Sequence, residues 1–366
     1  MLPLPGSPEE KATFAQLQSK LPDLFRWVSN DNRVSQTIVV IPSLSMDKRE
    51  LSKISGVHHY EERMLYTLML LRRARTRVIF VTSQAISPIV IDYYLHLLGG
   101  IPSYHARKRL ILFNCADAAN IPLSQKILRR PRLIQRIKEA IGSLDKAHMV
   151  CFNSTPLERT LSVQLGIPLY ANDPDYNELG TKSGCREIFR AAGIQFPDGF
   201  ERLKDQHDIA EALSILWDRN NQIKRAVVKL NEGFSGEGNA VFYYGDLQAF
   251  DQIERKKKIL SMLPNLRFEA PQENWESFHK KYQDMEGVVE EWIEGKDKQS
   301  PSSQCRVNAL GKAVSISTHD QCLGGPSGQV FMGCTFPAKI DYRLDIQAAG
   351  MKVATELASR GVMGRF

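Results

Sequence analysis

The chain has 366 residues, of which 43% are hydrophobic and 24% are charged, and its formal net charge is +7. This composition is ordinary for a globular protein and excludes a disordered or collagen-like chain. The length corresponds to roughly two or three domains, so the core is large enough to need no disulfides. The 6 cysteines are scattered without a C-x-x-C pair, which favours reduced thiols in a cytoplasmic protein.

Two further classes of protein are disfavoured by the distribution of charge and hydrophobicity. The first residues contain no basic region followed by an apolar run, so we expect no signal peptide. The most apolar window, residues 78–98, is interrupted by polar residues and Pro88, which indicates a strand, a loop and a helix, not a membrane span. We therefore predict no membrane partner.

Three basic clusters occur, at Arg72–Arg77, Arg129–Arg132 and Arg255–Lys258. We interpret them as solvated helix ends, where cations are favoured by the helix dipole. Attraction of acidic or phosphorylated ligands is an alternative. No aromatic residues are interleaved with them, so we predict no nucleic-acid partner.

The chain begins with an arm, residues 1–36, in which Ser7 and Pro8 predict the start of a helix that runs to about Lys20. From 37 to 173, apolar strands alternate with helices. We expect strands at 37–43, 77–82, 110–114 and 149–152, and helices at 61–73, 89–98 and 133–143. Continuous apolar strands of this kind indicate a parallel sheet covered on both faces, and hence a Rossmann-like α/β domain.

The cluster His58, His59, Glu61 and Glu62 precedes the helix expected at 61–73. It lacks the pair of histidines four residues apart that marks a zinc site on a helix. We therefore predict a solvated role at the helix start for these side chains.

After Pro174 the pattern changes to α+β, and its most informative segment is 227–241. An apolar run that carries Lys229 enters a glycine-rich turn and returns as a second apolar run, which predicts a strand, a loop and a strand. Glycines allow the backbone to approach a ligand closely, and successive N–H groups can surround an anion. The turn contains the candidate phosphate contacts Gly233, Ser235, Gly236 and Gly238.

An ordinary glycine-rich hairpin is the alternative interpretation of this segment. The sequence contains no G-x-x-x-x-G-K-[ST] motif. The turn also lacks the strand-to-helix setting of a dinucleotide fingerprint.

Two other segments fit a nucleotide. In Gly287–Gly295, an apolar strand leads into Glu290, Glu291, Trp292 and Glu294, and such a hinge can read an adenine edge, although acidic surface turns are also common. Lys182 begins a short helix that ends at Gly193. The positive end of that helix also favours phosphate.

Taken in order, Lys182, Lys229 with Gly233–Gly238, and Glu290–Gly295 resemble the ATP-grasp superfamily of carboxylate–amine ligases. The resemblance is closer to the pheganomycin-type peptide ligases, which have a pre-ATP-grasp domain. It extends from about Thr37 to the end of the chain. Supporting segments are 114–117, 123–128, 301–304, 317–321 and 328–338.

The resemblance implies a fold of class α/β plus α+β. The domain at 37–173 would be the Rossmann-like pre-ATP-grasp domain. Residues 174–287 would form the nucleotide-binding lobe, and 288–366 a C-terminal lobe that is incomplete. Antiparallel strands at 313–318 and 330–336 and a helix at 345–360 are expected there, with Cys305, Cys322 and Cys334 on one sheet and no metal bound by them.

The implied activity is ATP-dependent joining of a carboxylate to an amine through an acyl phosphate, with small-molecule or peptide substrates. Lys182 and Lys229 would neutralise phosphate charge, and Gly233–Gly238 would close as a lid. Glu290, Glu291 and Trp292 would form the adenine hinge, and Glu294 would meet the ribose. Arg306 is the candidate catalytic residue that holds the acyl phosphate, with a surface ion pair as the alternative; His319 is interpreted as an ordinary sheet residue.

One departure from the family concerns the metal. In ATP-grasp enzymes an acidic residue on a late strand and a Glu-x-Asn pair on the next strand bind Mg²⁺. Here Gly361–Phe366 resembles the strand start before those ligands, so we expect a C-terminally truncated chain whose Mg²⁺ ligands lie beyond its end, and no metal ligand within it. A non-catalytic ATP-binding module is therefore the alternative function. The substrate and the oligomeric state are not specified by the sequence.

Overall fold

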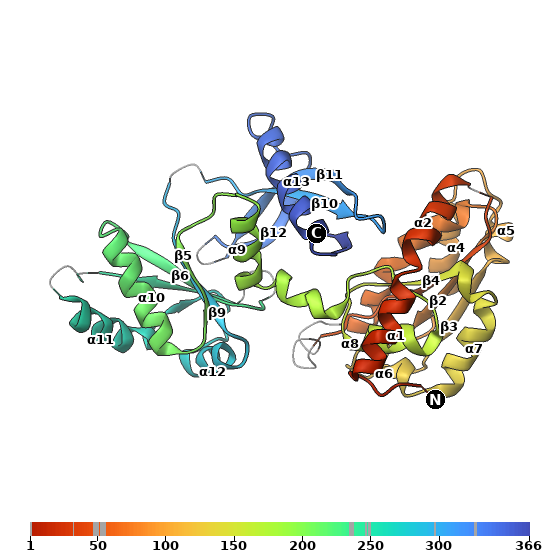
Figure 1. Ribbon diagram of the computed structural model, residues 1–366, viewed down its shortest axis with the longest axis horizontal. Helices are drawn as coiled ribbons and strands as arrows, with labels where there is room; N and C mark the ends of the chain where they lie inside the picture. The colour runs from red at the N-terminus through yellow and green to blue at the C-terminus, as the bar shows by residue number, and fades with distance from the viewer. Residues whose placement is uncertain are drawn as a thin grey trace. The chain divides into compact units, whose positions relative to one another are not determined.

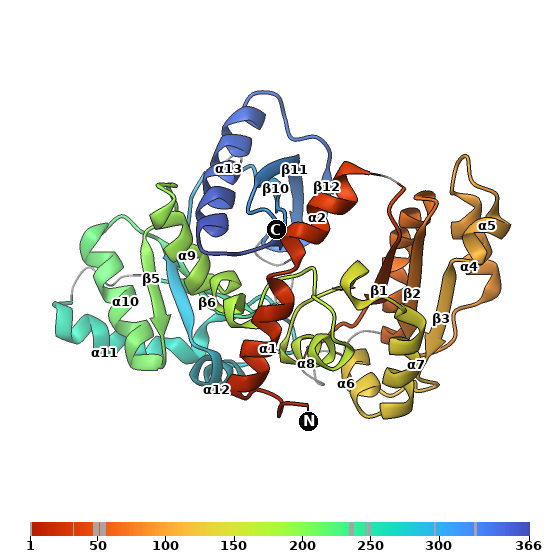
Figure 2. The ribbon, with the colours of Figure 1, turned by 45° about the vertical axis from the view of Figure 1, so that its right-hand side comes forward.

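The structure, a computed structural model, describes residues 2–31, 33–46, 51, 56–233, 238–245, 247, 250–295, 298–325 and 328–366 (Figures 1 and 2). The chain forms two compact units. Unit 1 comprises Met1–Asp175, Asn308–Gly311 and Val362–Gly364, and unit 2 comprises Tyr176–Val307, Lys312–Gly361 and Arg365–Phe366. The finer domain boundaries expected at 37, 174 and 288 stay predictions.

Unit 1 is built on a four-stranded sheet in the order β3-β2-β1-β4. All three strand pairs are parallel, as the apolar runs predicted. Because a parallel sheet is buried on both faces, its strands contain few polar residues. The strands are β1 (Gln36–Ile41), β2 (Thr76–Thr82), β3 (Leu110–Asn114) and β4 (Ala147–Cys151).

Helices cover both faces of this sheet. Ile38 and Val40 of β1 pack with η1 (Val57–Arg72), α4 (Pro88–His96) and α5 (Ser103–Arg107). Val39 and Ile41 belong to the core on the opposite face, because successive side chains of a strand alternate between faces. That core is completed by α1 (Pro8–Gln18), α6 (Leu123–Leu128), α7 (Pro131–Ile141) and α8 (Pro156–Leu165).

The N-terminal arm is helical, as expected. Ser7 accepts a hydrogen bond from the Glu10 N–H at 3.2 Å and so caps α1, which has Pro8 at its first position. A second helix, α2 (Leu21–Asn30), follows. Phe14 and Leu17 of α1 are buried in the core of unit 1, so the arm is part of this unit's packing.

The expectation for Glu61 is wrong. The helix that contains it is a 3-10 helix that starts at Val57, four residues earlier than predicted. Glu61 is only 6% exposed, and its carboxylate accepts hydrogen bonds from Ser83 N at 2.6 Å and Ser83 Oγ at 2.5 Å. His59 and Glu62 instead form the exposed pair, with 2.9 Å between Nδ1 and Oε1. The sequence did not show that the loop after β2 supplies partners for a buried carboxylate.

Unit 2 contains an antiparallel five-stranded sheet in the order β5-β9-β6-β7-β8. The predicted hairpin is confirmed, because β6 and β7 pair in antiparallel register with Lys229 opposite Asn239. One face of the sheet is covered by α10 (Gln206–Arg219), α11 (Gln252–Met262) and α12 (Trp275–Met285). The strands are β5 (Gly199–Leu203), β6 (Arg225–Leu230), β7 (Asn239–Tyr243), β8 (Arg267–Phe268) and β9 (Gly287–Glu291).

The basic run Arg255–Lys258 was expected at a helix end. It lies inside α11 instead. Arg255 is buried and forms an ion pair with Asp218 of α10. Lys256 pairs with Glu211, also of α10, at 2.7 Å. Two residues of the run therefore attach α11 to α10.

A second sheet of unit 2 has the order β12-β11-β10-β13. Its first three strands are antiparallel, as predicted, and α13 (Arg343–Ser359) packs on β10 and β11. Cys305, Cys322 and Cys334 lie on this one sheet, and all six cysteines of the chain are unpaired. The strands are β10 (Pro301–Val307), β11 (Ala313–Gly324), β12 (Val330–Thr335) and β13 (Gly364–Arg365). Within the described ranges, no helix has the length and apolar character of a membrane span.

Candidate nucleotide site

The candidate site lies on the face of the five-stranded sheet that α10, α11 and α12 leave uncovered. In the register of β6 with β9, Lys229 is opposite Val288 and Glu290 is opposite Val227. Residues that face each other across a strand pair share a face, so Lys229 and Glu290 project from the same side at diagonal positions. Their side chains form an ion pair through Oε2 of Glu290. The two strands thus bring together one residue from each of two predicted segments.

The third predicted segment reaches the same place through Asn231, which directly follows β6. The Asn231 carbonyl accepts a hydrogen bond from Lys182 N at 3.1 Å. Its side-chain oxygen accepts bonds from Ser183 N at 3.0 Å and Ser183 Oγ at 2.7 Å. The start of α9 (Lys182–Ala191) is therefore fixed to the end of the strand that carries Lys229.

The electrostatics of Lys182 reflect this position. Burial lowers its pKa, and the positive charge of Lys229 lowers it further. Two ammonium groups that interact in this way form a pair of cations that a bound anion would stabilise. The roles of Lys182 and Lys229 toward phosphate stay predictions.

The backbone at the start of α9 does not have the role expected from the sequence. We expected the free N–H groups of the first turn to favour phosphate. Instead Asn231 accepts from the N–H groups of Lys182 and Ser183, and Thr181 Oγ1 accepts from that of Gly184 at 3.0 Å. Buried polar groups are nearly always paired, and here the pairing consumes the helix's donors. The contribution of this segment is therefore the Lys182 side chain.

Glu290 is shared by two cations. Its Oε1 accepts from Arg186 Nη1 at 2.8 Å, while Oε2 pairs with Lys229. Burial would raise the pKa of Glu290, which is 8% exposed, but Lys229 and Arg186 lower it overall, so the carboxylate is ionised. The site thus contains a fixed negative charge between two positive ones.

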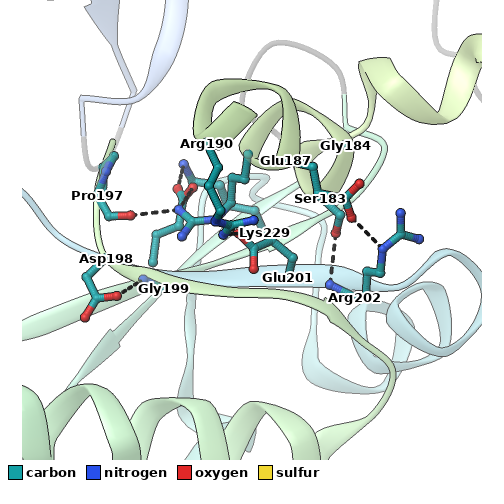
Figure 3. A network of polar contacts seen from close by, with 12 residues as sticks. Ser183, Gly184, Glu187, Arg190, Pro197, Asp198, Gly199, Glu201, Arg202 and Lys229 are labelled. Atoms are coloured by element: carbon teal, nitrogen blue, oxygen red, sulfur yellow. Dashed lines mark hydrogen bonds and ion pairs between the residues drawn. The ribbon is translucent and has the colours of Figure 1, made fainter. Parts of the chain in front are cut away.

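Arg186 is itself firmly held, and Figure 3 labels two of its partners, Pro197 and Glu201. It is 3% exposed, and its guanidinium donates to Glu201 Oε1 and to the Pro197 carbonyl, both at 2.9 Å. Glu201 also pairs with Arg190. In an outer layer, Arg202 donates from its backbone N–H to Ser183 Oγ at 3.0 Å. These contacts attach α9 to β5.

The predicted adenine hinge is closely packed against its own strand neighbours. Glu291 N donates to the Asp198 carbonyl at 2.9 Å. The Trp292 ring lies near two cations, with the Arg225 guanidinium 4.3 Å and the Lys298 ammonium 4.8 Å from its centroid. Glu294 accepts two bonds from Arg225 at 2.8 and 2.9 Å. The roles of Glu290, Glu291, Trp292 and Glu294 toward adenine and ribose stay predictions.

The glycine-rich loop is only partly described. Leu230 N donates to the Gly238 carbonyl at 2.9 Å, and a Cβ on Gly233 would lie 3.2 Å from Gly238 Cα, so the two ends of the loop approach closely. Ser235 and Gly236 lie outside the described residues. The predicted lid stays a prediction.

Arg306 lies on β10, in the second sheet of unit 2 and not in the five-stranded sheet that carries Lys229. Ser303 and Cys305 approach Gly350 of α13, so Arg306, the next residue of β10, projects from the opposite face. Its Nε is buried and has no hydrogen-bond partner among the described residues. His319 makes a 3.3 Å contact with Ser317 Oγ and packs on Phe336. The role of Arg306 toward an acyl phosphate stays a prediction.

In the part of the chain that the structure describes, no group of three or more His, Cys, Asp and Glu side chains gathers around a common point. Mg²⁺ in nucleotide enzymes is commonly held by one or two carboxylates together with phosphates. The described side chains thus do not form a protein cage for this ion.

Sequence reasoning missed Arg186, Ser183 and Asn231. Arg186 follows Lys182 by four residues, and residues at this spacing lie on the same face of a helix. That spacing was the one available signal. The role of Asn231 depends on contacts between segments 48 residues apart, which no local pattern shows.

Residues 176–265 match the IQCH-like ATP-grasp family. Over 90% of its length the chain is 27% identical to the L-propargylglycine–L-glutamate ligase of Streptantibioticus cattleyicolor, of which it covers 67%. It is 24% identical to the IQ motif-containing protein H of Danio rerio, covering 90% of this chain and 35% of that protein.

A solved structure of similar fold is biotin carboxylase from Campylobacter jejuni in complex with β,γ-ATP. The TM-score is 0.52 at 12% identity, over 91% of this chain and 61% of that chain. At this identity the likeness concerns the fold alone. Since the family match over residues 176–265, the sequence similarity to a ligase and the fold agree, the resemblance to the ATP-grasp superfamily drawn from the sequence is confirmed.

Proposed function

We propose that the protein is an ATP-dependent ligase that joins a carboxylate to an amine. The observation that carries the proposal is the convergence of Lys182 and Lys229, from segments far apart in sequence, at one end of an ATP-grasp sheet. The similarity to L-propargylglycine–L-glutamate ligase, whose name describes the joining of two amino acids, supports this reaction class. The substrates would be small-molecule or peptide carboxylates and amines.

In the proposed site, the lysines neutralise the phosphates of ATP, because ionised donors make the strongest hydrogen bonds to phosphate oxygens. Lys182 lies near Lys229, so an anion between them would relieve their repulsion. Glu290, Glu291, Trp292 and Glu294 would receive the nucleoside. Gly233, Ser235, Gly236 and Gly238 belong to the loop that would cover the phosphates.

The proposed reaction has two steps. A substrate carboxylate oxygen attacks the γ-phosphorus, and the bond from this phosphorus to the β,γ-bridging oxygen breaks. ADP departs, and the substrate becomes an acyl phosphate. The amine nitrogen then attacks the acyl carbon, inorganic phosphate departs, and the nitrogen loses a proton to give the amide. Arg306, with its unpartnered Nε, would hold the phosphate oxygens of the intermediate. Closure of the glycine-rich loop would exclude water.

We propose Mg²⁺ as the metal ion on the basis of the family resemblance. Among the described residues, no group of three or more His, Cys, Asp and Glu side chains gathers to hold this ion. The six unpaired cysteines favour a reducing compartment, which supports a cytoplasmic location.

A second candidate is an ATP-binding module without ligase chemistry. It is favoured by the match of residues 176–265 to the IQCH-like ATP-grasp family and by the similarity to IQ motif-containing protein H, whose name does not state a reaction. The chain covers 35% of that protein. Both candidates require ATP binding, and they differ in whether phosphate is released.

The test is calorimetric titration of the purified 366-residue chain with a non-hydrolysable ATP analogue, with and without Mg²⁺, for the wild type and Lys229→Ala. We expect binding that Lys229→Ala weakens at least about tenfold, since a charge-assisted hydrogen bond is lost. Phosphate release from ATP with mixtures of amino acids then tests ligase activity. Binding without release would favour the second candidate, and no binding at millimolar analogue would contradict both.

A further inference from the structure

The two cations that share Glu290 are held very differently. Arg186 has three acceptors: Glu290 Oε1, Glu201 Oε1 and the Pro197 carbonyl. Lys229 has Glu290 as its ion-pair partner in the part of the chain that is described. Arg186 is anchored on several sides, whereas Lys229 is connected to the network through one carboxylate oxygen.

The exposure of the two side chains differs in the same direction. The Lys229 side chain is 23% exposed, and that of Arg186 is 4% exposed. A lysine has a flexible stem that can redirect its charge, whereas the planar guanidinium is rigid once its donors are satisfied. Lys229 is therefore the member of the network that is able to exchange Glu290 for another anion.

On the basis of the proposed function, we propose that Arg186 is a positioning residue that lets Glu290 hold Lys229 before ATP binds and release it to the phosphates afterwards. Arg186 takes one of the two carboxylate oxygens and part of the negative charge. The positive charge of Arg186 offsets part of the negative charge of Glu290. Without Arg186, Lys229 would be the main counter-charge of this buried carboxylate, and the attraction between Lys229 and Glu290 would increase. Phosphate would then compete less well for the lysine.

The neighbouring charges agree with this role. Lys182 repels Lys229, which favours the contact of Lys229 with Glu290 while no phosphate is present. A phosphate bound between the lysines would reverse that preference. Glu201 balances the charge of Arg186, and Arg190 pairs with Glu201 from the exposed side of α9. Arg186 is thus able to remain in place while Lys229 moves.

The test compares the affinities of ATP and adenosine, measured by calorimetry at fixed salt and pH. Adenosine lacks the phosphates, so the ratio of the two affinities isolates the phosphate contacts. We expect Arg186→Gln to lower this ratio about tenfold, consistent with the strength of a hydrogen bond to a charged group. Glu290→Gln, which frees Lys229, is expected to raise the ratio. Arg186→Lys keeps the positive charge and should restore part of the affinity ratio that Arg186→Gln loses.

Arg190→Gln is the matched control, because Arg190 lies on the same helix and contacts Glu201 but not Glu290; its ratio should equal that of the wild type. Circular dichroism verifies folding, and if Arg186→Gln unfolds, Arg186→Lys and Glu290→Gln still give opposite expected shifts. Equal losses for both ligands in Arg186→Gln, or a lowered ratio in Glu290→Gln, would overturn the role of Arg186. Absence of ATP binding by the wild type would instead overturn the proposed function.

Discussion

Glu61 of unit 1 was expected to be solvated, but its side chain is buried. Its carboxylate contacts Ser83, whose hydroxyl also accepts a bond from Lys126 Nζ at 2.8 Å. Lys126 is 1% exposed and donates in addition to the Asp117 carbonyl at 2.9 Å. Burial raises the pKa of Glu61 to about 7, although Ser83 and Lys126 oppose the shift.

This pKa predicts a pH dependence of stability. The folded value of about 7 exceeds the model-peptide value of 4.5, so the folded state binds the proton more tightly than the unfolded state. The stabilisation is fully present below pH 4.5 and is lost as the pH rises through 7, by about 3 kcal/mol in total. Glu61→Gln should remove this component, as measured by urea unfolding at pH 5 and pH 8.

The control for this prediction is Glu62→Gln, which changes the neighbouring exposed carboxylate that contacts His59. Its stability should vary with pH as the wild type's does. An identical pH dependence in Glu61→Gln and the wild type would contradict the assignment of the proton to Glu61.

Asn231 of unit 2 is also a buried polar residue, and its side chain binds Ser183 at the start of α9. Asn231→Ala removes the acceptor of Ser183 N and Ser183 Oγ and leaves a buried N–H without its partner. We expect a loss of about 1–3 kcal/mol in the free energy of unfolding, together with weaker ATP binding, because the start of α9 carries Lys182. Thermal unfolding and calorimetry measure the two effects. Asn221→Ala, at an exposed position, should change neither; unchanged ATP affinity in Asn231→Ala would contradict the coupling.

Gly287 shows how closely β9 approaches β6. A Cβ at this position would lie 2.3 Å from the Lys229 carbonyl oxygen and 2.4 Å from the Tyr282 ring. Gly287→Ala should therefore displace β6 or α12 and destabilise the protein by about 1–3 kcal/mol, as overpacking does. Because β6 carries Lys229, ATP affinity should fall as well. Chemical denaturation and calorimetry measure these changes.

Gly180→Ala is the matched control, since a Cβ there meets no atom within 4 Å and the backbone has no positive φ. It should be neutral or slightly stabilising, because alanine restricts the unfolded chain. Equal effects of Gly287→Ala and Gly180→Ala would contradict the steric argument.

The elements differ in how well the sequence specifies them. The strands of unit 1 were predictable because Thr37–Ile41 and Val78–Thr82 are buried on both faces and form continuous apolar runs. By contrast, β5 has the mixed sequence of Gly199–Leu203, and none of its residues is fully buried. β8 has two residues and was not predicted. Short strands of mixed composition depend on their sheet partners more than on their own pattern.

The same distinction applies to the candidate site. Lys182 and Lys229 were identified because each stands beside a local signal, a helix start or a glycine-rich turn. Arg186 was not, because its bond to Glu290 joins residues 104 positions apart. Sequence patterns therefore located the segments, whereas the network that connects them required the fold.

Two sheets of the protein offer different places for a nucleotide. In open parallel sheets, ligands bind outside the carboxyl ends of the strands, where the strand order reverses. In unit 1 this is the edge beyond β1 and β4. There Ser45 Oγ donates to Glu158 Oε1 at 2.5 Å, and Ser45 N donates to Asn153 at 2.9 Å. The polar groups of Ser45, Asn153 and Glu158 at that edge are thus hydrogen-bonded to one another. In unit 2, by contrast, Lys182 and Lys229 carry positive charges that can bind an anion.

Hydrogen exchange tests this choice between the units. A ligand that binds the folded state at a concentration of 100 times its Kd stabilises it by about 2.7 kcal/mol. We expect a saturating ATP analogue to slow exchange in α9, β6 and β9 of unit 2 and to leave β1 and β4 of unit 1 unchanged. Lys229→Ala should abolish the protection. Slower exchange at the ends of β1 and β4 would instead place the nucleotide on the parallel sheet, where the polar groups of Ser45 and Glu158 would have to exchange their present partners for the ligand.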